Sequence, residues 1–233
     1  MGRVLLEVIV TDVADAQAAA RGGADRVELV GRADLGGMTP DPALAAAVAS
    51  ALDIPVRAML RVTESHLLTS SDVAALIADA ERLLDAGVTE LVLGAAAPDG
   101  QPDTATLQPV IDTVAGMPFT FHRALDTAPD LVESVRAVLA LPGCDTVLTS
   151  GHPAGVATGL PRLEALLSAA PDLGATVMVG GGLRVEHLPR LVGAGAGAVH
   201  LGRTVRDGGS WSGAVHESEV AGVRRRLDEL TTG

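Results

Sequence analysis

Charged side chains that could support acid–base chemistry follow a short apolar run near the middle of this sequence. Residues 118–126 read PFTFHRALD, so strand-forming residues lead directly to His122, Arg123 and Asp126. A parallel strand delivers side chains to the carboxyl edge of its sheet in this way. We therefore predict a catalytic site here; the alternative is that the histidine and arginine are held in buried ion pairs.

Two glutamates lie inside other apolar runs, Glu7 in LLEVIV and Glu28 in RVEL. A buried carboxylate has to be paired or functional, because an unpaired buried charge costs too much free energy. One interpretation is a lattice of Glu–Arg ion pairs that holds a barrel together. The other is proton transfer together with His122, in which case Arg61, at the end of a further run, belongs to the same catalytic group.

Glycine-rich stretches follow three apolar runs in the last part of the chain: TSGHPAG at 149–155, VGGGLR at 179–184 and HLGR at 200–203. Glycine amides at such positions bind phosphate in many barrels, and an arginine adds a bidentate contact. Tight turns also need glycine, which is the alternative explanation. The candidate anion-binding residues are Ser150, Gly151, Gly181, Gly182, Gly202 and Arg203.

Composition excludes several classes of protein. All 17 basic residues are arginine, so chemistry that needs a lysine amine is ruled out, including Schiff-base aldolases, pyridoxal phosphate linkage and the P-loop. The formal net charge of −12 disfavours a nucleic-acid partner. The single cysteine, Cys144, fits a reducing compartment. With neither a signal-peptide pattern nor a long apolar segment, we expect a cytoplasmic protein with no membrane partner.

The elements that must position these residues alternate regularly between apolar strands and helical stretches. Eight such units predict a single-domain (β/α)₈ TIM barrel, an α/β fold, over residues 1–233. An open doubly wound sheet is the alternative, but no GxGxxG follows the first strand. The expected strand–helix pairs are 4–10 with 12–20, 26–30 with 41–52, 55–61 with 71–86, 90–94 with 103–115, 119–123 with 130–141, 146–149 with 160–169, 176–179 with 185–192, and 198–201 with 216–230.

Metal-binding residues are poorly spaced along the chain, because there is no cysteine pair and no HxxxH pattern. A metal site would have to be assembled across strands from Glu7, Glu28, His122 and His200. The residues themselves therefore predict no definite cofactor. His66 lies in the long third loop and could belong to a lid.

Motifs along nearly the whole chain resemble those of the CutC family, which is named for a proposed role in copper homeostasis. The resemblance implies a cytoplasmic (β/α)₈ barrel that tends to form a homodimer, with a copper ion as partner. The motifs are LEV with Glu7, GGADRVEL at 22–29, GGMTP at 36–40, DG at 99–100, TFHRALD at 120–126, VLTSG at 147–151 and GGG at 180–182.

This chain departs from the family pattern at positions that matter for copper. Ile9 and Val30 stand where the family commonly has cysteine, and only Arg61 remains of an Arg-Pro-Arg-Gly-Gly pattern. Because Cu(I) prefers thiolate or thioether ligands, the sequence argues against a dedicated thiolate site. Two hypotheses remain: a copper-homeostasis protein, or a lysine-independent isomerase or lyase that acts on a small anionic or phosphorylated metabolite.

Overall fold

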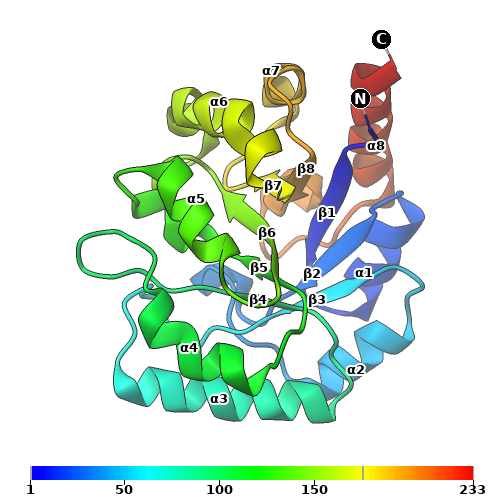
Figure 1. Cartoon of the computed structure of the whole chain (residues 1–233). Coiled ribbons are helices and arrows are strands. Elements are labelled where there is room, and N and C mark those ends of the chain that lie inside the picture. Colours follow the sequence, from blue (N-terminus) through cyan, green and yellow to red (C-terminus); the bar gives the residue numbers. More distant parts are fainter. Residues whose placement is uncertain (1, 175, 233) are drawn as a thin grey trace.

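The chain folds into a closed barrel of eight parallel strands in sequential order, surrounded by helices (Figure 1). The computed structural model describes residues 2–174 and 176–232. The predicted TIM barrel is confirmed. The strands are β1 (Leu5–Val10), β2 (Arg26–Leu29), β3 (Val56–Met59), β4 (Leu91–Leu93), β5 (Phe119–Phe121), β6 (Cys144–Thr149), β7 (Thr176–Val179) and β8 (Ala198–Leu201).

One α-helix follows each strand and covers the outside of the barrel (Figure 1). The last helix packs against both the seventh and the first, so the outer ring closes where the barrel closes. The helices are α1 (Val13–Arg21), α2 (Pro42–Ser50), α3 (Ser70–Asp85), α4 (Thr104–Thr113), α5 (Leu131–Leu139), α6 (Val156–Leu173), α7 (Leu188–Gly193) and α8 (Glu217–Thr232).

Polar side chains at the helix starts explain where five of these helices begin. Each N-cap side chain accepts a hydrogen bond from a backbone N–H of the first turn, which would otherwise lack a partner. At the start of α3 the capping is reciprocal, because Asp72 also accepts from the N–H of the capping Thr69. The five caps are Asp12, Asp41, Thr69, Asp103 and Asp130.

Strand alternation divides the core into an outer apolar layer and a mixed interior. In β2, Val27 and Leu29 join the large apolar cluster with the helices. The alternate residues Arg26 and Glu28 are also buried, yet they are charged. Successive side chains of a strand point to opposite faces of the sheet. Since Val27 and Leu29 face the helices, Arg26 and Glu28 face the interior of the barrel. The barrel interior therefore carries buried polar groups that need partners.

Arg57 of β3 supplies several of those partners at the amino-terminal end of the barrel. Its guanidinium donates to Glu90 at 2.9 Å, to Thr120 of β5 at 2.6 Å and to Asp145 of β6 at 2.7 Å. The three acceptors come from three successive segments of the barrel wall. A planar guanidinium can reach them together because its five N–H donors spread as a fork. This arginine network closes the amino end, away from the predicted site.

Some element boundaries differ from the sequence prediction. The fifth strand ends at Phe121, not at Arg123, because residues 123–127 form a 3₁₀ helix, η2 (Arg123–Thr127), which His122 caps. The sixth strand begins earlier, at Cys144. Helix α6 begins at Val156 and ends at Leu173, so it is longer than the predicted 160–169.

Within residues 2–174 and 176–232, no helix is both long and apolar enough to cross a bilayer.

Candidate functional site

A cavity of about 1180 Å³ opens at the carboxyl ends of the strands. The loops after β2, β3, β5, β7 and β8 form its walls, which is where active sites lie in TIM barrels. Nine of the twelve predicted site residues line it: Glu28, Arg61, His122, Arg123, Asp126, Gly181, Gly182, Gly202 and Arg203. Glu7, Ser150 and Gly151 are buried and do not line it.

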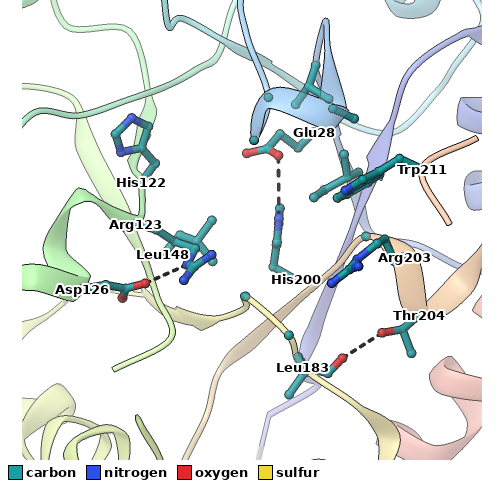
Figure 2. A pocket seen from close by; sticks show the side chains of 18 of the residues that line it. Glu28, His122, Arg123, Asp126, Leu148, Leu183, His200, Arg203, Thr204 and Trp211 are labelled. Atoms are coloured by element: carbon teal, nitrogen blue, oxygen red, sulfur yellow. Dashed lines mark hydrogen bonds and ion pairs between the residues drawn. The ribbon is translucent and has the colours of Figure 1, made fainter. Parts of the chain in front are cut away.

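Three buried side chains from β1, β8 and β2 are linked below the cavity, and two of them, His200 and Glu28, line it. His200 Nδ1 lies 2.8 Å from Glu7 Oε1, and His200 Nε2 lies 3.7 Å from Glu28 Oε2. Figure 2 shows His200 and Glu28 facing each other at the centre of the site. Glu7 also pairs with the guanidinium of Arg26. Because Glu7 fixes Nδ1, the Nε2 atom of the imidazole is the one directed toward Glu28 and the cavity.

The two glutamates are equally buried but have opposite electrostatics. Burial raises the pKa of Glu28 from 4.5 to about 7, and the nearby charge of Glu7 adds to this rise. Burial alone would raise the pKa of Glu7 as well, but Arg26 and His200 lower it to about 2. The two glutamates therefore differ in their partners. Glu7 forms an ion pair with an arginine, as the ion-pair interpretation of the sequence expects, whereas no arginine within the described residues pairs with Glu28.

His200 holds its proton more tightly than an ordinary histidine in this setting. Burial tends to lower its pKa, but Glu28 and Glu7 outweigh burial and raise it above 6.5. Glu28 Oε1 is buried and has no hydrogen-bond partner among the described residues. A carboxyl with a pKa of about 7 and an unused oxygen is suited to proton exchange with a ligand near neutral pH.

Two neutral histidines form another part of the wall. His66 and His122 have their ring centroids 5.1 Å apart. Burial, Arg61 and Arg123 lower the pKa of His66 to about 4. Burial, His66 and Arg61 hold the pKa of His122 well below 6.5. His122 Nδ1 accepts the amide of Ala124 at 3.3 Å, so the neutral ring carries its proton on Nε2.

Asp126 organises the loop after β6 and leaves little capacity for a ligand. Its carboxylate accepts from Arg123 Nε at 2.7 Å, from Thr149 Oγ1 at 2.7 Å, and from the amide and hydroxyl of Ser150 at 2.8 and 2.6 Å. The amide of Gly151 donates to Thr149 Oγ1 at 2.9 Å. Ser150 and Gly151, predicted to bind an anion, therefore hold their own loop, because both amides already have acceptors.

The glycines after β7 and β8 have a different environment. Within the described residues, the amides of Gly181, Gly182, Gly202 and Arg203 donate no hydrogen bond. A Cβ at Gly181 would lie 2.6 Å from the Arg123 guanidinium carbon, so only glycine allows that guanidinium to pack against the loop. Unused amides beside Arg203 on a cavity wall are suited to an oxyanion.

Trp211 covers this part of the cavity and was not assigned from the sequence. Its ring packs against Gly202 and Ile9 and lies beside Arg203 (Figure 2). The guanidinium of Arg206 stacks on the ring at 5.5 Å from its centroid and pairs with Asp15 at 2.7 Å. The segment that carries the tryptophan is thereby tied to the start of α1.

Sequence reasoning placed His200 at a strand end and among possible metal ligands, but not among the catalytic candidates. The signal that could have found it is the alternation in β8, where Ala198 and His200 share the inner face. His66 carried a weaker signal, because nothing in the third loop indicated that the chain turns back to His122.

A model of the CutC family matches residues 4–205. A CutC family protein of Sinorhizobium medicae is 35% identical over 98% of this chain and 93% of that protein. The human protein named copper homeostasis protein cutC homolog is 35% identical over 88% of this chain and 76% of its own. The crystal structure of CutC from Streptococcus agalactiae shares the fold, with a TM-score of 0.77 and 24% identity over 85% of this chain and 98% of that one. Since both the family model and these relatives span most of the sequence, the chain belongs to the CutC family.

Proposed function

We propose that the cavity binds a small phosphorylated metabolite and that Glu28 and His200 exchange protons with it, as in an isomerase or a lyase that does not use lysine. The observation that carries this proposal is that one cavity joins unused loop amides to a buried acid–base pair. The loops after β7 and β8 would hold the phosphate through the amides of Gly181, Gly182 and Gly202 and through Arg203. The fold by itself supports no particular reaction.

The proton-transfer step follows from the two pKa shifts. With a pKa of about 7, Glu28 is partly ionised at neutral pH and can accept a proton from a substrate carbon or hydroxyl. His200, whose pKa is raised, can donate the Nε2 proton to a substrate oxygen. After this step Glu28 is protonated and His200 is neutral. Returning the proton of Glu28 to a neighbouring substrate atom, while His200 recovers its own, completes an isomerisation. Glu7 orients the imidazole throughout.

Thermal shift with inorganic phosphate and with glycerol 3-phosphate tests the binding part. Both ligands are expected to raise the melting temperature of the wild type, and Gly182→Asp should abolish the effect by placing a carboxylate in the anion site. Gly87→Asp is the matched control. Gly182 and Gly87 both have a positive φ, +75° and +85°, and both have open space where a Cβ would lie. Gly87, however, lies in the turn between α3 and β4, outside the cavity. An equal loss in both variants, or no stabilisation of the wild type, contradicts the proposal.

Copper binding in a copper-homeostasis role is the second candidate. Glu7, Glu28 and His200 each offer a ligand atom, and the three atoms lie within 4.8 Å of one another. These nitrogen and oxygen donors do not fit Cu(I), which prefers sulfur, and for Cu(II) both oxygens of Glu7 are already engaged, one by Arg26 and the other by His200. The only cysteine, Cys144, lies at the amino-terminal start of β6, where burial raises the pKa of its thiol to about 12.

The same thermal shift assay separates the two candidates. Stabilisation by Cu(II), but by neither phosphate compound, that survives in Gly182→Asp and is lost in His200→Ala would support the copper role and overturn the enzyme proposal. Stabilisation by phosphate alone would do the reverse. The cytoplasmic location and the homodimer implied by the family remain proposals, and light scattering on the purified protein tests the dimer.

A further inference from the structure

Arginines without a carboxylate partner gather at the cavity although the protein is acidic overall. Among the described residues, only four of the 17 arginines have no carboxylate within ion-pair distance: Arg61, Arg162, Arg203 and Arg225. Two of these four, Arg61 and Arg203, line the cavity. The other two cavity arginines are neutralised, since Arg123 pairs with Asp126 and Arg184 with Glu186. The cavity therefore presents two arginines that have no carboxylate within ion-pair distance.

The guanidinium of Arg61 is fixed in place by backbone oxygens alone. Its Nε donates to the carbonyl of Thr63 and one terminal nitrogen to that of Gly36, both at 2.9 Å. The other terminal nitrogen donates to the carbonyl of Glu64. Three of the five N–H donors are thus used, and the two terminal nitrogens keep one each. Holding a half-buried charge rigidly without an ion pair is unfavourable, because the charges of Glu64 and Glu28 act on it only from beyond contact distance. Burial indeed lowers the pKa of Arg61.

Arg61 and the glycine loops lie on opposite walls of the cavity. Arg61 follows β3, whereas Gly181 and Gly182 follow β7, and these strands are four places apart in a closed ring of eight. Glu28 of β2 and His200 of β8 come from strands that lie between β7 and β3 in the ring. They face each other at the centre of the site (Figure 2). A ligand that lies over this acid–base pair and reaches both walls would place an anionic group at each end.

We propose that the substrate is a phosphorylated carboxylic acid, with its phosphate in the loops after β7 and β8 and its carboxylate on Arg61. This inference rests on the proposed function and specifies its substrate class. A carboxylate suits Arg61 better than a second phosphate, because a planar fork with two remaining N–H groups matches two coplanar oxygens. The two glycines on the Arg61 side of the cavity, Gly36 and Gly37, already donate their amides to the carbonyls of Ala33 and Arg32, unlike Gly181, Gly182 and Gly202. Arg61 then binds substrate and sets specificity.

Two matched ligand pairs test the carboxylate independently of the phosphate. Glycerol 3-phosphate and 3-phosphoglycerate differ only in a terminal CH₂OH against a carboxylate. Glucitol 6-phosphate and 6-phosphogluconate differ in the same way on a six-carbon chain, so the test does not depend on one ligand length. Isothermal titration calorimetry with the wild-type protein should show the acid of at least one pair binding about tenfold tighter or more, the effect expected of a charge-assisted bidentate contact.

Substitutions then assign the difference to Arg61. Arg61→Met should bring the dissociation constants of the acid and the alcohol in each pair to within about twofold of each other. Glycerol 3-phosphate or glucitol 6-phosphate should still bind to this variant. Arg61→Lys, which keeps the charge and loses the fork, should retain part of the ratio. Arg184→Met is the matched control, because this rim arginine already has a carboxylate partner, and the ratio should survive. The melting temperature of each unliganded variant shows whether the loop around Arg61 has kept its fold.

The outcomes distinguish this inference from the proposed function. If the phosphorylated alcohols bind and neither acid binds more tightly, the carboxylate assignment is wrong and the phosphate site stands. If the preference for the acid persists in Arg61→Met, or is lost equally in Arg184→Met, a general positive potential explains it and Arg61 has only a structural role. If none of the four compounds binds, both proposals are overturned.

Discussion

Replacing Glu28 by glutamine should make the stability of the protein less sensitive to pH. A glutamate pKa raised from 4.5 to about 7 corresponds to about 3 kcal/mol between its two protonation states. The folded protein holds this proton more tightly than the unfolded chain, so between pH 4.5 and 7 the native state binds more protons. Stability contributed by the protonated glutamate is therefore complete below pH 4.5 and is lost as the pH rises through 7.

The assay is urea denaturation followed by far-UV circular dichroism at pH 4.5 and at pH 6.5. Over this interval the linkage relation gives a loss of about 2 kcal/mol from Glu28 alone in the wild type. The glutamine of Glu28→Gln does not titrate, so this variant should not show that loss. The difference in unfolding free energy between Glu28→Gln and the wild type should therefore shift by about 2 kcal/mol in favour of the variant from pH 4.5 to pH 6.5. The upper limit is set at pH 6.5, the ordinary pKa of histidine. The pKa of His200 lies above this value, so His200 stays protonated in the folded wild type over the whole interval.

Glu7→Gln serves as the opposite control. The pKa of Glu7 is lowered to about 2, so its ionised form contributes stability above pH 4.5, and this is lost only as the pH falls toward 2. That variant should be destabilised by a similar amount at both pH 4.5 and pH 6.5. A difference between Glu28→Gln and the wild type that stays constant across the interval would refute the reasoning, since Glu28 would then titrate as an exposed carboxyl does.

Two further predictions concern the loops around the cavity. Asp126→Asn should lower the unfolding free energy by about 3 kcal/mol in the same assay, because the amide oxygen can accept from Thr149 and the Ser150 amide but its NH₂ group cannot accept from Arg123 or the Ser150 hydroxyl. An unchanged urea midpoint would contradict the role of this carboxylate as the organiser of its loop. Gly202→Ala would bring a Cβ to 2.5 Å from the ring of the only tryptophan, so the fluorescence emission should shift to longer wavelength as the ring moves toward water. Gly197→Ala, with no atom within 4 Å, should leave the spectrum unchanged, and equal spectra for both variants would argue against the packing described.

Much of the fold could be predicted because its signals are local. The apolar runs at 176–179 and 198–201 coincide with β7 and β8, since a parallel strand buried on both faces is apolar along its whole length. Helix α6 was predicted too short. Gly159 and Pro161 favour a later start, but a tertiary contact overrides that preference, because Gly159 packs directly against the backbone of residues 150 and 151.

The candidate site could be predicted less completely, because its main contact joins the two ends of the chain. Alternation indicated that Glu7 and His200 could both face inward, but their pairing depends on the register between β1 and β8, and the two residues are 193 positions apart. The sequence also could not distinguish Glu7 from Glu28. Both glutamates lie level with an arginine of a neighbouring strand, Glu7 with Arg26 and Glu28 with Arg57. Only Glu7 gains an ion pair, because the guanidinium of Arg57 donates to Glu90, Thr120 and Asp145 instead.

The arginine network at the amino end also bears on how the barrel unfolds. Arg57 belongs to the first four strands, while Thr120 and Asp145 belong to the last four. A fragment with only the first half would leave that guanidinium with Glu90 alone, and one with only the second half would lack it entirely. Because one side chain couples the two halves, they should open as a single cooperative unit, and amide hydrogens in β3, β5 and β6 should exchange with solvent together.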